Sequence, residues 1–88
     1  MSALDVSFVI PCYNEEVAIR SVIADFSAAL PQAAIHVFDN NSSDHTAQYA
    51  AEAGAVVHMV KLRGKGNVVR RMFADIEADA YVMVDGDD

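Results

Sequence analysis

The sequence predicts an α/β protein in which helices cover both faces of a parallel sheet. Four short apolar runs alternate along the chain with three segments whose apolar residues recur at helical spacing. Polar and charged residues follow directly after each apolar run, as they do at the carboxyl edge of a parallel sheet. Right-handed crossovers between the strands then predict a three-layer arrangement with strand order 3-2-1-4.

The first half of the chain predicts a strand, a helix and a second strand. Residues 6–10 are apolar throughout, so we expect a central strand that is buried on both faces and closed by Pro11. Asn14 is placed to cap the next helix, which Pro31 ends. Residues 35–38 form the second strand. The apolar residues of the helix keep i, i+3, i+4, i+7 spacing and are Ile19, Val22, Ile23, Phe26 and Leu30.

The second half begins with an Ala-rich helix. Ser43 or Asp44 is expected to cap this helix, which runs to Ala53 and has Gly54 as its stop. Residues 55–60 then form the third strand.

A basic loop, a third helix and a fourth strand complete the chain. The loop spans residues 61–67, and the fourth strand spans residues 80–84. One face of the helix between them is apolar and carries Val69, Met72, Phe73 and Ile76.

Composition and charge limit the possible functions. At 88 residues and 53% hydrophobic content, the chain suits one small packed domain. Six Lys and Arg against thirteen Asp and Glu give a net charge of -7, which argues against nucleic-acid binding and is compatible with metal binding. Cys12 is the only cysteine, so an internal disulfide is excluded and we expect a reducing, cytoplasmic setting. No segment resembles a signal peptide or a membrane-spanning helix, and peripheral or anchored membrane association of a longer protein stays open.

The residues that could bind a ligand or take part in a reaction follow directly after the strands. Ligands of open parallel sheets bind in the crevice beyond the carboxyl ends of the strands, so these residues are expected to share one edge. They are Tyr13, Asn14, Glu15, Asp39, Asn40, Arg63, Lys65, Asp85 and Asp87.

The Asp-x-Asp motif after the fourth strand predicts a divalent metal. Asp85 and Asp87 share one face of an extended segment, and Gly86 leaves the backbone between them open to a ligand. Carboxylates, phosphate oxygens and water suit Mg²⁺ or Mn²⁺. The alternative is an acidic turn that caps the next element.

Asp39 ends the second strand, where a lone carboxylate is costly unless it is solvated or paired. It is a candidate acceptor for hydrogen bonds from a nucleobase or ribose, and the alternative is that it caps the following turn. The loop with Arg63, Lys65 and Gly66 suits an anion but matches no phosphate-binding motif.

The histidines and the cysteine are weaker candidates. His36 and His58 lie within strands and are expected to be packed or edge residues, and His45 is expected to be exposed. Cys12 lacks an evident activating base and is expected to pack in the core.

Taken together, four motifs resemble the family 2 glycosyltransferases of the GT-A fold, a family that includes dolichol-phosphate mannosyltransferase. The resemblance covers essentially the whole chain. It implies a Rossmann-like half-domain, residues 1–88, that binds the nucleotide-sugar donor and is truncated after the Asp-x-Asp motif. The motifs span residues 9–15, residues 37–46, residues 64–67 and residues 85–87.

The resemblance also implies residue roles. Pro11, Tyr13 and Glu15 would line the nucleoside pocket, while Asp85 and Asp87 would bind the diphosphate through Mg²⁺ or Mn²⁺. The acceptor would be a hydroxyl, a glycan or a polyprenyl phosphate, and the general base would lie outside these residues, so no catalytic residue is assigned. The implied donor-binding residues are Pro11, Tyr13, Glu15, Val37, Asp39, Lys65, Asp85, Gly86 and Asp87.

The chain departs from the family pattern at two places. Many members read Asp-Asp-Gly-Ser where this chain has residues 39–42, Asp-Asn-Asn-Ser, so a second acidic contact is missing, and His45 replaces a common glycine. Two alternative functions remain: a haloacid-dehalogenase-type phosphatase, which shares the hydrophobic strand and Asp-x-Asp, and a nucleotide-binding module without catalysis. The open edge of the fourth strand further predicts that the isolated fragment self-associates.

Overall fold

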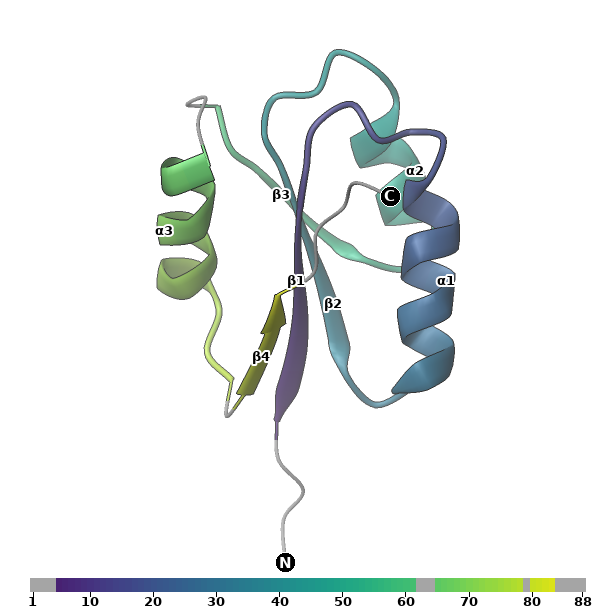
Figure 1. Ribbon diagram of the computed structural model, residues 1–88, viewed down its shortest axis with the longest axis vertical. Coiled ribbons are helices and arrows are strands. Elements are labelled where there is room, and N and C mark those ends of the chain that lie inside the picture. The colour runs from purple at the N-terminus through teal and green to yellow at the C-terminus, as the bar shows by residue number, and fades with distance from the viewer. Residues whose placement is uncertain (1–4, 62–64, 79, 84–88) are drawn as a thin grey trace, which may run out of the picture.

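The computed structural model describes residues 5–61, 65–78 and 80–83, without the side chains of residues 65–68 and 73. Within them, four strands form one parallel sheet in the order β3-β2-β1-β4 (Figure 1). The predicted fold class and strand order are therefore confirmed. The strands are β1 (Val6–Cys12), β2 (Ala34–Asp39), β3 (Val56–Met59) and β4 (Ala80–Met83). The helices are α1 (Ile19–Ala29), α2 (Thr46–Glu52) and α3 (Lys65–Asp75).

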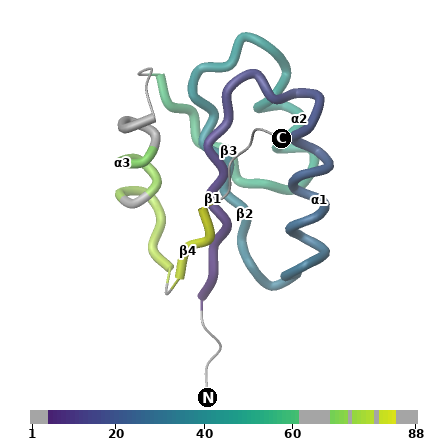
Figure 2. Tube along the Cα trace, in the orientation of Figure 1, coloured from purple at the N-terminus to yellow at the C-terminus, as the bar shows by residue number. Residues whose placement is uncertain are grey.

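The central strand β1 separates two apolar layers. Helices α1 and α2 lie on one side of the sheet and α3 lies on the other, as the trace shows (Figure 2). Successive side chains of a strand point to opposite faces, so β1 supplies Ile10 to the first layer and Val9 to the second. Both side chains are buried, which confirms the prediction of a strand covered on both faces.

Pro11 does not close the first strand, contrary to the prediction, because β1 continues to Cys12. The backbone oxygen of Cys12 faces β2 and accepts a hydrogen bond from the Asn40 N–H at 2.8 Å. Since backbone groups alternate in direction along a strand, the nitrogen of Pro11 faces the β4 side. The last described pair there joins Val9 to Met83, so the missing N–H of proline interrupts no described ladder bond.

The helix starts differ from the predictions. Asn14 does not cap α1, because that helix begins at Ile19 and its first turn has no side-chain cap. For α2, neither Ser43 nor Asp44 is the N-cap, which is His45 and makes no side-chain cap bond. Asp44 directly precedes it, and its Oδ1 accepts the Thr46 N–H at 3.0 Å. Helix α3 begins at Lys65, so the predicted loop of residues 61–67 is shorter than expected.

The stop of α2 is confirmed. Gly54 has a φ of 100°, a left-handed conformation that side chains with a Cβ rarely adopt. The Ala55 N–H reaches back to the Ala50 oxygen at 3.1 Å and the Gly54 N–H to the Ala51 oxygen at 3.1 Å. These bonds satisfy carbonyl groups that the helix end would otherwise leave without partners. None of the described helices is long and apolar enough to cross a membrane.

A histidine pair joins β2 to β3 beneath α3. His36 Nδ1 and His58 Nε2 are 2.9 Å apart, and the ring of His58 stacks on Phe38 with centroids 4.3 Å apart. Asp75 of α3 lies 3.9 Å from His58 Nδ1 and also pairs with Arg71 at 3.0 Å. Both histidines are half-buried within strands, and His58 lies on the edge strand β3, in line with the prediction of packed or edge positions.

Burial lowers the pKa of both histidines below 6.5. For His36 the neighbouring His58 adds to this effect; for His58, Asp75 opposes it and Arg71 reinforces it. The unfolded chain therefore binds protons more tightly than the folded chain, and stability is lost as the pH falls through the folded pKa values.

We expect the free energy of unfolding to fall when the pH drops from about 7.5 to about 5.5. Urea titrations followed by circular dichroism at each pH would measure this fall. The double variant His36→Gln/His58→Gln should show a smaller decrease, whereas His45→Gln, outside the pair, should keep it. A decrease in the double variant equal to that of the wild type would contradict this assignment.

Candidate functional site

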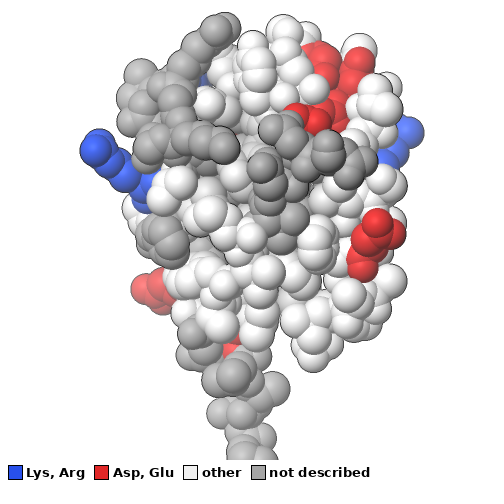
Figure 3. Space-filling model, viewed as in Figure 1, with Lys and Arg blue, Asp and Glu red and all other residues white. Residues whose placement is uncertain are grey.

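Two loops lie together at the edge of the sheet where β1 and β2 end. The β1–α1 loop comprises residues 13–18, and the β2–α2 loop comprises residues 40–45. The two strands stay in register up to the pair of Cys12 with Asp39, so both loops leave the sheet at the same level. Figure 1 shows them side by side at the top of the molecule, above α1 and α2. Acidic side chains gather at this end in the space-filling view (Figure 3).

Asp39 is the buried carboxylate of this edge. The residue is only 1% exposed, and the Ser42 hydroxyl donates a hydrogen bond to its Oδ1. The same hydroxyl oxygen accepts the backbone N–H of Asn14 at 2.8 Å. The predicted requirement that a carboxylate here be paired is met by Ser42, through a hydroxyl that also reaches the other loop.

Asn14 connects the loops a second time. Its Oδ1 accepts the Ser43 N–H at 2.9 Å. Asn14 has a φ of 52° and Asn41 a φ of 61°, so each loop turns through a left-handed residue of the kind that asparagine tolerates. The role of Asn14 is therefore to shape and join the loops, in place of the predicted helix cap.

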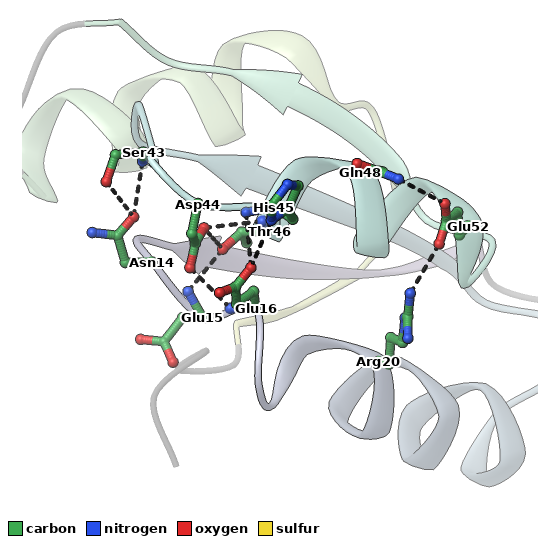
Figure 4. A network of polar contacts seen from close by, with 10 residues as sticks. All are labelled: Asn14, Glu15, Glu16, Arg20, Ser43, Asp44, His45, Thr46, Gln48 and Glu52. Atoms are coloured by element: carbon green, nitrogen blue, oxygen red, sulfur yellow. Dashed lines mark hydrogen bonds and ion pairs between the residues drawn. The ribbon is translucent and has the colours of Figure 1, made fainter.

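Asp44 accepts hydrogen bonds from the first residue of α2 and from the β1–α1 loop. Its Oδ1 accepts from the N–H and the hydroxyl of Thr46, and its Oδ2 accepts the Glu16 N–H at 3.3 Å (Figure 4). Thr46 is completely buried, and its Oγ1 accepts the Glu15 N–H at 2.8 Å. Partial burial alone would raise the pKa of Asp44, but the hydrogen bonds from Thr46 and Glu16 outweigh it and lower that pKa.

Ion pairs border this network on the solvent side. Glu16 Oε2 accepts from the backbone N–H of His45 and lies 3.1 Å from His45 Nδ1. The side chain of His45 is exposed, as predicted. Further along, Arg20 pairs with Glu52 at 3.0 Å and lies over the Tyr49 ring at 3.9 Å. Pairs this exposed contribute little to stability.

The structure brings part of the predicted site together. Pro11, Tyr13, Glu15 and Asp39 all lie at this edge, with Tyr13 exposed and Glu15 half-buried. Val37 does not reach the surface, because its side chain is fully buried in the layer beneath α1 and α2.

The remaining predicted residues lie outside the described structure in whole or in part. Lys65 is the first residue of α3, but its side chain is not described. Asp85, Gly86 and Asp87 lie beyond the last described residue, Met83. Among the described residues, no group of three or more His, Cys, Asp and Glu is arranged to hold a metal ion.

Sequence reasoning missed the roles of two hydroxyl residues, and it placed Asn40 at this edge without foreseeing that its side-chain oxygen is buried. Ser42 and Thr46 each link a carboxylate to a backbone N–H of the other loop. Asn40 Oδ1 is buried without a hydrogen-bond partner among the described residues. The available signal was the alternation of Ser42, Asp44 and Thr46 directly after a strand, but contacts with residues some thirty positions away cannot be read from it.

A protein-family model identifies the family of the chain. The model described as glycosyl transferase family 2 matches residues 7–88, so the chain belongs to this family. Protein RfbJ of Shigella flexneri is 62% identical over 86 residues, which cover 98% of this chain and 67% of that protein. Glycosyltransferase AglJ of Haloferax volcanii is 40% identical over 78 residues, which cover 88% of this chain and 25% of that protein.

Solved structures agree with the family assignment. Mycobacterium tuberculosis glucosyl-3-phosphoglycerate synthase superposes with a TM-score of 0.84 at 32% identity, covering 97% of this chain and 35% of that one. A mycobacterial protein superposes with a TM-score of 0.86 at 34% identity, covering 97% of this chain and 32% of that one. The Rossmann-like GT-A architecture is therefore confirmed, and this chain spans about a third of the length of these two structures.

Proposed function

We propose that residues 1–88 form the donor-binding subdomain of a glycosyltransferase that transfers a sugar from a nucleoside diphosphate to a hydroxyl or lipid-phosphate acceptor. The observation that carries this proposal is the pair of hydrogen-bonded loops at the carboxyl edge of β1 and β2, in a chain of glycosyl transferase family 2. Ligands of open parallel sheets bind at this edge. The family assignment favours a transferase over the haloacid-dehalogenase-type alternative.

The nucleoside would lie against the β1–α1 loop. Tyr13 offers an exposed aromatic ring, Pro11 and Glu15 flank it in sequence, and Asp39 lies at the base of the same edge for a contact with the base or ribose. Complexes of the M. tuberculosis synthase contain UDP and, in another case, UDP-glucose with phosphoglyceric acid and Mn²⁺, which supports a nucleotide-sugar donor here. Lys65 would lie beside the donor.

Asp85 and Asp87 would hold a divalent cation, with Gly86 open to the diphosphate. Two carboxylates separated by glycine fit the hard oxygen ligands that Mg²⁺ and Mn²⁺ prefer. The position of β4 beside β1 supports this proposal, because parallel strands end at the same edge. When bound, the cation would offset charge that develops on the leaving diphosphate.

The acceptor and the general base would come from sequence outside these residues. Transfer would invert the anomeric carbon, with a glycan or polyprenyl phosphate as possible acceptors. A cytoplasmic location, with peripheral or anchored membrane attachment of a longer protein, fits the single cysteine and can be tested by cell fractionation. A nucleotide-binding module without catalysis is the second candidate, because the assigned groups all face the donor.

Asp87→Asn should weaken Mn²⁺-dependent UDP binding by at least about tenfold, since even indirect partners of a metal change its affinity that much. The melting temperature should change little, because the substitution replaces one polar side chain by another of the same size. Isothermal calorimetry with and without Mn²⁺ measures the affinity, with Asp25→Asn on α1 as the matched control. Equal metal-dependent affinity in Asp87→Asn and wild type would show that Asp87 is not a ligand.

The 88-residue chain alone should bind nucleotide weakly and transfer no sugar. Because these residues would contact only one side of the nucleotide, its other side would stay solvated. Solvent then reduces the contribution of each polar contact to the affinity. The test is incubation with Mn²⁺, UDP-, GDP- and dTDP-sugars, and lipid-phosphate acceptors, followed by mass spectrometry. Multiple turnover above that of the Asp85→Asn/Asp87→Asn double variant would contradict the absence of catalytic groups.

The chain should also self-associate through the edge of β4. Among the described residues β4 pairs only with β1, and its Val82 and Met83 are exposed. Light scattering should show dimers or larger species that Val82→Lys reduces. Val17→Lys, at a 96% exposed position outside the sheet, is the matched control. A monodisperse monomer at high concentration would rule this interface out.

A further inference from the structure

We propose that two carboxylate–hydroxyl relays act as positioning devices for the nucleoside-facing β1–α1 loop. The first relay runs from Asp39 through Ser42 to the backbone N–H of Asn14. The second runs from Asp44 through Thr46 to the backbone N–H of Glu15. This inference rests on the proposed function, because it states that Ser42 and Thr46 fix the position of the loop against which the nucleoside binds.

The chemistry of the four side chains fixes the direction of each relay. An ionised carboxylate only accepts hydrogen bonds, so the hydroxyl must donate its single proton to Asp39 or Asp44. The lone pairs of that hydroxyl are then left to accept, and a backbone N–H of the other loop lies 2.8 Å away in each case. Each hydroxyl thus joins a charge on the β2 side to an amide on the β1 side, and charge-assisted bonds of this kind are the strong ones.

The two relays act on consecutive amides. Asn14 and Glu15 are neighbours in sequence, and Tyr13 directly precedes them. Fixing both N–H groups fixes the peptide planes on either side of Asn14, whose φ of 52° is unusual for a residue with a side chain. The loop therefore holds its shape without glycine, through contacts supplied by the β2–α2 loop.

Burial makes the second relay sensitive to small changes. Thr46 is completely buried, so water cannot readily replace its hydroxyl beside the Glu15 N–H. In the first relay Asp39 is 1% exposed, but the bond from the Asn14 N–H to Ser42 is open to solvent. Figure 4 shows the second relay at the centre of the network, with Asp44 and Thr46 on one side and the backbone of Glu15 and Glu16 on the other. A loop that already has its bound shape loses less conformational entropy when a nucleotide binds than a mobile loop would.

Thr46→Val tests the second relay, because valine keeps the shape of threonine and removes the hydroxyl. Thr46→Ser keeps the hydroxyl and serves as the rescue variant, and Ser21→Ala removes a hydroxyl of α1 outside both relays. Nuclear magnetic resonance on the 88-residue chain measures two quantities in one sample. These are the hydrogen-exchange rate of the Glu15 amide and the dissociation constant for UDP with Mg²⁺ from chemical-shift titration.

We expect Thr46→Val to speed exchange at Glu15 by about tenfold and to weaken UDP binding by about fivefold, the effect of losing one partly buried hydrogen bond. Thr46→Ser and Ser21→Ala should stay close to wild type in both quantities. Ser42→Ala should speed hydrogen exchange at the Asn14 amide as Thr46→Val does at the Glu15 amide. This second variant keeps the test available if one of the two folds poorly.

Two results would overturn the inference. A lower melting temperature of Thr46→Val with unchanged UDP affinity would show that the hydroxyl only stabilises the fold. Unchanged exchange at Glu15 would show that the relay does not hold that amide. If the wild type itself binds no UDP, the proposed function fails instead, and the exchange rates still report whether the relays fix the loop.

Discussion

The site depends on the parallel pairing of β1 with β2, which stays in register to Cys12 and Asp39 and is closed by the Asn40 N–H on the Cys12 oxygen. This pairing makes both strands end at one level, so the loops that follow start side by side. Apolar packing on both faces of β1 supports the pairing, with Ile10 in one layer and Val9 in the other. Every cross-loop hydrogen bond described above requires this shared starting level.

Most of the fold could be predicted because it follows from patterns within short segments. Apolar runs and helical spacing identify the elements, and alternation with right-handed crossovers leaves few arrangements, of which 3-2-1-4 is the observed one. Errors arose where a tertiary contact overrides a local signal. Proline usually ends a central strand, but Pro11 faces the β4 side beyond the last described pair. Asparagine is a preferred helix cap, but the side chain of Asn14 is held by Ser43 of another loop.

The candidate site was predictable in outline and not in its supporting contacts. The rule that ligands bind beyond the strand ends located Tyr13, Glu15 and Asp39 at one edge. It could not show that Asp39 is almost completely buried, nor that Val37 faces the core. Ser42 and Thr46 escaped notice because a hydroxyl after a strand is common, and its importance depends on which distant amide and carboxylate lie within hydrogen-bond reach.

A crystal structure of the protein with UDP-glucose and Mn²⁺ tests most directly whether a nucleotide binds against the two joined loops. We expect the nucleoside against residues 13–15 and Asp39, with the diphosphate and the metal at Asp85 and Asp87. The same hydrogen bonds should join the two loops with the ligand as without it. A nucleotide bound at the opposite edge of the sheet, or on the outer face of α3, would contradict this placement of the donor site.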